Sequence, residues 1–123
     1  MTIMKLFCNK SSMTLAMLTV LASLMTPPAF SYEIDESNTF IEGLAAYQQG
    51  IFSSAINILE NWIKEYPDSL ILDLGLYWLA QSYYQVGNQR EAARYISLFF
   101  SVYPESPLIA TIDHDFKNLA KRY

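Results

Sequence analysis

The chain is poor in the residue types that most often carry chemistry. Its 123 residues include a single cysteine, Cys8, and a single histidine, His114. One cysteine cannot form an internal disulfide. Four isolated glycines do not make a phosphate-binding loop. His114 lies between Asp113 and Asp115, and alternate residues on a helix point about 200° apart, so the three side chains do not converge on a metal. We therefore predict a non-enzymatic protein without metal or cofactor.

Basic residues are also few. The chain has eight lysines and arginines against twelve acidic residues. Because Lys5 and Lys10 precede residue 32, the remainder carries six basic residues and a net charge of −6. An acidic chain without a basic stripe in its sequence binds phosphate backbones poorly, which argues against nucleic acid or an anionic lipid surface as the partner.

The first 31 residues have the pattern of an export signal. Lys5 and Lys10 precede the apolar run MTLAMLTVLASLM at residues 13–25, and small residues lead to a cut after Ser31. This run is shorter than the roughly 20 residues that cross a bilayer. Cys8 precedes the run, whereas a lipoprotein signal carries its cysteine just after it. We expect cleavage after Ser31, which leaves no membrane span. Retention as an uncleaved anchor is the alternative.

Helical periodicity runs through the rest of the chain. After an acidic leader at residues 32–36, apolar spacing and end signals predict an all-α domain at 37–123. Gly50 and Gly87 favour helix ends, and Pro67 and Pro104 deny the backbone donors that helices need. Asn88 with Glu91 three residues on, and Ser106 before Pro107, are typical of helix caps. Five helices are predicted, at residues 37–49, 52–65, 69–86, 88–102 and 107–122.

The same pattern occurs twice at a spacing of 37 residues. WIKEYPDS begins at Trp62 and FFSVYPES at Phe99. When the sequence is aligned with itself at a shift of 37 residues, identical residues pair at seven positions: Tyr47 with Tyr84, Gln48 with Gln85, Gly50 with Gly87, Ala55 with Ala92, Tyr66 with Tyr103, Pro67 with Pro104 and Ser69 with Ser106. Glycine marks the turn within a helix pair and proline marks the turn between pairs. A fixed repeat of this kind predicts stacked helix pairs.

This order of small, aromatic, glycine, alanine, large apolar and proline positions resembles the tetratricopeptide repeat. FIEGLAAYQQGIFSSAINILENWIKEYPDS is similar to repeats of exported bacterial envelope proteins, such as the Tol–Pal cell-division coordinator and the outer-membrane assembly lipoprotein. The resemblance implies repeats at about 37–67 and 69–104, a capping helix at 107–122, and a periplasmic location. The period exceeds the commoner value of about 34 residues, and two repeats are fewer than the three or so that usually close a core.

The resemblance also implies a binding face, because the first helix of each pair lines the concave side of such arrays. The residues expected there are Tyr47, Gln48, Tyr77, Gln81, Tyr84 and Gln85. Tyrosine beside glutamine suits a protein or peptide partner, since a rigid ring then lies next to an amide that can satisfy backbone groups. Packing between units is the favoured role for Phe40, Leu44 and Tyr77. The two roles remain balanced for Tyr47, Gln48, Tyr84 and Gln85.

A second interpretation places the interface at the edges of the array. Trp62, Phe99, Phe100 and Tyr103 are more aromatic surface than two repeats and one helix readily cover, and exposed patches of this kind mark interfaces. The chain would then be a structural subunit that forms a homo-oligomer or docks permanently into a larger envelope assembly. The leading hypothesis is an envelope adaptor or scaffold that binds through the concave face.

Overall fold

The computed structural model describes residues 28–123, with side chains from residue 34 onward. All regular elements in this part of the chain are helices, as the sequence predicts. They are α2 (Pro28–Gln48), α3 (Phe52–Glu65), α4 (Leu72–Gln85), α5 (Gln89–Val102), the 3-10 helix η1 (Pro107–Thr111) and α6 (His114–Arg122). The compact unit spans Asp35–Tyr123. Most of the predicted export signal, residues 1–27, lies outside the described residues.

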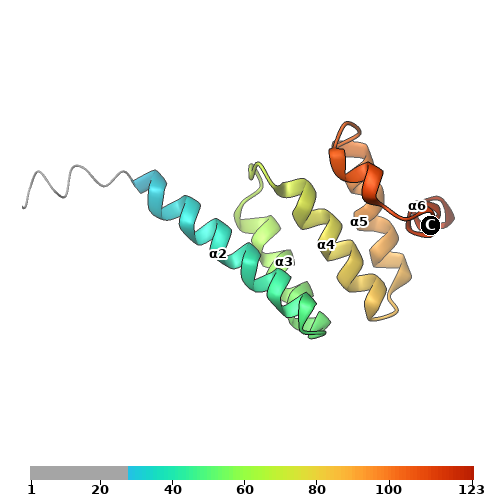
Figure 1. Cartoon of the computed structure of the whole chain (residues 1–123), viewed down its shortest axis with the longest axis horizontal. Helices are drawn as coiled ribbons and strands as arrows, with labels where there is room; N and C mark the ends of the chain where they lie inside the picture. The colour runs from blue at the N-terminus through green and yellow to red at the C-terminus, as the bar shows by residue number, and fades with distance from the viewer. Residues whose placement is uncertain (1–27) are drawn as a thin grey trace, which may run out of the picture. The chain divides into compact units, whose positions relative to one another are not determined.

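The helices of the compact unit pack in chain order. Figure 1 shows α3, α4 and α5 as neighbours, with α6 beyond α5. Two helix pairs, α2 with α3 and α4 with α5, follow one another, and α6 stands where the first helix of a third pair would stand. The fold class is therefore all-α, with helices packed sequentially as pairs.

The turn within each pair is built on a glycine in the left-handed conformation. Gly50 has a φ of 77° and Gly87 a φ of 82°. The amides of Ile51 and Asn88 donate to carbonyls five residues back, at 2.9 and 3.0 Å. This is the Schellman arrangement, which satisfies the last carbonyls of a helix and favours glycine because it has no Cβ. The side chain of Asn88 also accepts from the amide of Glu91 and caps α5, as its position predicts.

The turn between pairs uses a serine that binds the preceding first helix. The Ser69 hydroxyl donates to the Glu36 carboxylate, and the Ser106 hydroxyl donates to the Asp73 carboxylate at 2.9 Å. Each serine also accepts a backbone amide two residues on. All of these contacts are related by the 37-residue shift. The recurring YPDS and YPES segments are thus turns that tie each pair to the next.

The two largest fully buried side chains of the core lie on the second helices of the pairs. Trp62 and Phe99 are fully buried at equivalent positions. The Trp62 indole packs 5.2 Å from the Phe40 ring and donates from Nε1 to the Glu36 carbonyl at 2.9 Å. Gly75 faces Trp62 so closely that a Cβ there would come within 2.3 Å of the ring. A glycine at this position is what allows α4 to approach α3.

Some helix limits differ from the sequence-based prediction. α2 already begins at Pro28, so it runs through the expected leader at 32–36. α4 begins at Leu72 because Ser69 serves the turn. Ser106 caps η1 with Pro107 in its first turn, as predicted. The expected single helix at 107–122 is divided into η1 and α6, since Ile112 is extended (φ −77°, ψ 125°) and inserts its side chain into the core.

Candidate functional site: an aromatic row on the first helices

Aromatic side chains from α2, α4 and α6 form a continuous series of ring contacts. Tyr47 of α2 packs against Trp78 of α4 with ring centroids 4.9 Å apart, and Trp78 packs against Tyr77 at 5.2 Å. The series continues to Phe116 of α6, whose ring lies 6.4 Å from Tyr77 and 5.7 Å from Tyr84. These edge-on geometries are the favourable ones for aromatic pairs. We call the five residues the aromatic row.

The members of the row differ in exposure, and this decides what each can contribute. Phe116 is buried, whereas Tyr47, Tyr77 and Trp78 are half-buried. Tyr84 is 43% exposed. The other four rings each lie between two neighbouring rings and have little rotamer freedom left to lose when a partner covers them, whereas Tyr84 at the end of the row contacts Phe116 alone. The row is thus a rigid apolar surface with Tyr84 as its most accessible ring.

Polar groups accompany the row at the predicted positions. Gln81 donates from Nε2 to the Tyr77 hydroxyl at 3.2 Å, and Gln48 and Gln85 are exposed beside their tyrosines. A hollow of about 330 Å³ lies at the α6 end of the row and is lined by Gln81, Tyr84, Asp113, His114, Asp115 and Phe116. Amide and carboxylate groups beside a ring can satisfy the backbone donors of a bound peptide.

Sequence reasoning missed two members of the row, Trp78 and Phe116. The 37-residue shift places Trp78 opposite Ile41, so the repeat gave no aromatic signal there. Phe116 lies in the predicted last helix, but apolar spacing alone did not show that this helix lies beside α4. The six predicted residues all lie on α2 or α4, and the ring contacts bring Tyr47, Tyr77 and Tyr84 together.

The predicted aromatic edge is wrong for two of its four residues. Trp62 and Phe99 are 0% exposed, so neither can form an interface without unfolding. Each is covered because the second helix of a pair packs against the first helices on both sides. Phe100 and Tyr103 are half-buried. Burial, followed by the nearby Asp73 carboxylate, raises the pKa of Tyr103.

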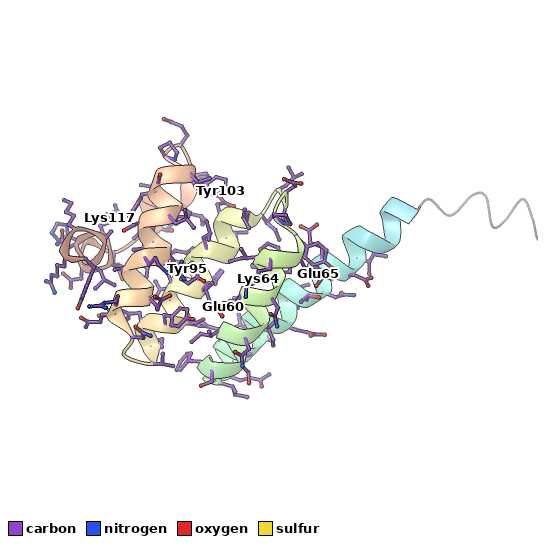
Figure 2. The ribbon with its side chains drawn as sticks, turned by 180° about the vertical axis from the view of Figure 1, so that it is seen from behind. Glu60, Lys64, Glu65, Tyr95, Tyr103 and Lys117 are labelled. Carbon is purple, nitrogen blue, oxygen red and sulfur yellow. The ribbon has the colours of Figure 1, made fainter. Side chains whose placement is uncertain are left out.

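A separate polar cluster joins α3, α4 and α5. The hydroxyls of Tyr83 and Tyr95 both donate to Oε1 of Glu60, with Tyr95 at 3.2 Å, and Figure 2 shows Glu60 and Tyr95 together. The two tyrosine rings are stacked at 5.7 Å, and the Arg94 guanidinium lies 4.2 Å from the Tyr95 ring centre. Burial raises the pKa of Tyr83, and the hydrogen bond to Glu60 adds to this effect. The cluster satisfies its own donors and fixes α5 in place.

The Asp113–Asp115 segment, considered above as a metal site, lies at the surface. Within residues 34–123, no group of three or more histidine, cysteine or acidic side chains could hold a metal ion. Asp113, His114 and Asp115 are exposed. In the part of the chain that the structure describes, no helix combines the length and apolar character that a membrane span requires.

Comparison with known families identifies the fold. The tetratricopeptide repeat model matches residues 40–69 and 75–106, and the chain belongs to this family. Repeats of this family act as protein–protein interaction modules and are typically non-catalytic. No catalytic family matches. No individual curated protein and no solved structure matches the chain.

Proposed function

We propose that the chain is an adaptor of the bacterial cell envelope that binds a partner protein or peptide through the aromatic row. The observation that carries the proposal is the ring series from Tyr47 to Tyr84, which runs across three first helices and leaves Tyr84 43% exposed. Rigid aromatic groups with exposed faces are the residues that dominate binding energy at protein interfaces. The glutamines beside them supply amides for an extended or helical segment.

The location in the cell envelope is a separate part of this proposal. Its support is the pattern of residues 1–31, two lysines, a short apolar run and small residues before a cut, together with the resemblance to exported repeat proteins. Sequencing the N-terminus of the protein recovered from the periplasmic fraction tests it. A chain that begins at Tyr32 supports export with cleavage, whereas an intact Met1 in the cytoplasm contradicts it.

The alternative is a structural subunit that associates through its edges. Only two of the four aromatic residues that supported it remain accessible. Trp62 and Phe99 are internal, so Phe100 and Tyr103 remain from the predicted aromatic edge. Both are half-buried, which makes them weaker anchors than Tyr84. The aromatic row is therefore the better-supported site.

Photo-crosslinking in the native cell tests the binding face. A photoreactive residue is placed at position 84, and a matched control is placed at Leu98 of α5, which has nearly the same exposure at 42%. We expect a protein captured from position 84 and not from position 98. The captured protein, once purified, should bind the Tyr84→Ala variant more weakly than the Leu98→Ala variant. Capture only from position 98, or equal binding by both variants, would contradict the proposal.

A further inference from the structure

The two ends of the helix array carry opposite charge. Eight of the twelve acidic residues lie between Glu33 and Asp73, whereas all basic residues after residue 31 except Lys64 lie on α5 and α6. These basic residues are Arg90, Arg94, Lys117, Lys121 and Arg122. Composition alone indicates a uniformly acidic protein. The fold instead gathers the positive charge on its last two α-helices.

The basic side chains border a groove between α5 and α6. One hollow of about 520 Å³ is lined by Ser97, Phe100, Ile109, Lys117, Ala120 and Lys121. A second, of about 640 Å³, shares Ser97 and is lined further by Ala93, Tyr123 and three arginines, Arg90, Arg94 and Arg122. We call the two hollows the α5/α6 groove. Its floor is apolar and its borders are basic. Figure 2 shows Lys117 on α6 at this end of the unit.

By repeat symmetry, the α5/α6 groove is equivalent to a surface that a helix covers elsewhere in the array. The 37-residue shift brings the buried Leu79 and Ser82 of α4 onto the buried Phe116 and Leu119 of α6, so α6 is equivalent to α4. Within the array, the equivalent position beside α3 and α4 is taken by α5, the second helix of its pair, which packs on α4 and reaches α3 through the hydrogen bond from Tyr95 to Glu60.

The shift also relates the two sets of groove residues. It takes Glu60, Ile63, Ala80, Tyr83 and Tyr84 to Ser97, Phe100, Lys117, Ala120 and Lys121. Ser97 and Ala120 thus replace Glu60 and Tyr83, whose hydrogen bond belongs to the cluster that holds α5, and lysines replace Ala80 and Tyr84. The α5/α6 groove is thus equivalent to a helix-covered surface, but it lacks the internal carboxylate and has gained two lysines.

The opposite end of the array shows the complementary change. The face of α4 that packs on α3 includes Leu72, Gly75, Trp78 and Leu79. The equivalent residues of α2 are Asp35, Asn38, Ile41 and Glu42. All four are exposed, and Ile41 is 58% exposed. We call them the α2 stripe. It is acidic and carries one exposed isoleucine.

We propose that a second copy of this chain docks its α2 stripe into the α5/α6 groove. The carboxylates of Asp35 and Glu42 then lie against the lysines of the groove, and Ile41 covers the apolar floor at Phe100. Within residues 34–123 the only ion pair joins Arg94 to Glu91, so neither groove lysine is paired with a carboxylate in this part of the chain. Opposite charges on facing surfaces select the partner and speed its approach.

The contact uses a different surface on each copy, so it is heterologous. Such contacts add copies head to tail, into open filaments or closed rings, and the assembly grows with protein concentration. The groove and the stripe share no residue with the aromatic row, so this inference does not depend on the proposed function. Each copy within such an assembly keeps its aromatic row available to a different partner.

Sedimentation velocity on the protein as purified from its cells tests the proposal. We expect the mean mass to grow as the protein concentration approaches about 1 mM, the weak end of measurable association. Raising the ionic strength from about 0.05 M to about 0.5 M should weaken association roughly tenfold, because it shortens the screening length severalfold. A protein that stays monomeric under all these conditions would overturn the proposal and identify both surfaces as polar caps.

Charge reversal distinguishes this contact from any other self-association. One variant carries Lys117→Glu with Lys121→Glu, and the other carries Asp35→Lys with Glu42→Lys. Each alone should be monomeric, and circular dichroism should confirm that each remains folded. An equal mixture of the two should associate again, since each reversed surface then faces one of opposite charge. Association that survives in either single variant, or a mixture that stays monomeric, would overturn the proposed pairing.

Discussion

Gly75→Ala changes one hydrogen into a methyl group at the closest approach of α3 and α4. The added Cβ would lie 2.3 Å from Cζ3 and 3.0 Å from Cε3 of Trp62. Ordinary contacts between carbon atoms begin near 3.5 Å, so the ring must move by about 1 Å. Trp62 is fully buried and donates its Nε1 hydrogen to the Glu36 carbonyl, which leaves the ring little room to yield.

Two opposing effects set the expected magnitude. Overpacking a closely packed core costs about 3 kcal/mol at the severe end of the usual range. Replacing glycine by alanine within a helix returns about 1 kcal/mol. We therefore expect a net loss of about 2 kcal/mol in the free energy of unfolding. For a domain of this size that corresponds to a fall of about 10 °C in Tm.

Urea unfolding followed by circular dichroism measures the loss. The matched control is Gly43→Ala, whose Cβ would meet Leu59 Cδ2 at 2.8 Å. The Cβ would also meet Leu59 Cγ at 2.9 Å, but both distances exceed the 2.3 Å approach at Gly75, and a leucine side chain shifts more readily than an indole held by a hydrogen bond, so we expect a smaller loss for this variant. In a Trp62→Leu background, Gly75→Ala should cost less than in the native chain, since the ring that it strikes is gone. A Gly75→Ala variant as stable as the native protein would refute this account of why α4 approaches α3.

Four further outcomes test other contacts. Tyr84→Ala should weaken partner binding about tenfold, measured by calorimetry, while Leu98→Ala leaves it unchanged; the reverse order would contradict the binding face. Ser106→Ala should lower the free energy of unfolding by about 1 kcal/mol, because the Asp73 carboxylate loses its hydrogen-bond donor. An unchanged stability in urea denaturation would contradict the role of this hydrogen bond in the turn between pairs. Gly87→Ala should cost about 1 kcal/mol through left-handed strain alone, since nothing lies within 4 Å of its Cβ position; a neutral result in thermal unfolding would contradict it. The pKa of Tyr83 is raised above the ordinary value of 10.0, so its share of stability is complete below pH 10 and declines as pH rises beyond it. Tyr83→Phe should flatten the decline in an unfolding series from pH 9 upward, and an unchanged decline would contradict the assignment.

The helix pairs could be predicted because their signals are local. Gly50 and Gly87 form the predicted turns, Asn88 and Ser106 form the predicted caps, and Pro67 and Pro104 follow the predicted helix ends. Each depends on backbone geometry within a few residues, which the residue type itself restricts. The repeat at a shift of 37 residues combined these local signals into a prediction of the all-α class and of the repeat family.

The limits of local signals appear at the last helix. Apolar spacing predicted one helix at 107–122, but Ile112 is extended and separates η1 from α6. The division places Ile112, Phe116 and Leu119 in the core together. Periodicity could not reveal this, because an apolar stripe has the same spacing on both sides of a break.

The sequence by itself determined the helices, their turns and caps, the repeat that relates the pairs, and an overall acidic charge. Only the tertiary structure decided which aromatic residues are core and which are surface. Trp62 and Tyr84 are both aromatic residues of predicted helices and both were interface candidates, yet one is fully buried and the other is 43% exposed. The exposure of an aromatic residue depends on which neighbouring helix packs over it. The basic groove likewise forms only where α5 and α6 pack side by side. Both follow from packing between helices, which residue order encodes only through the complete fold.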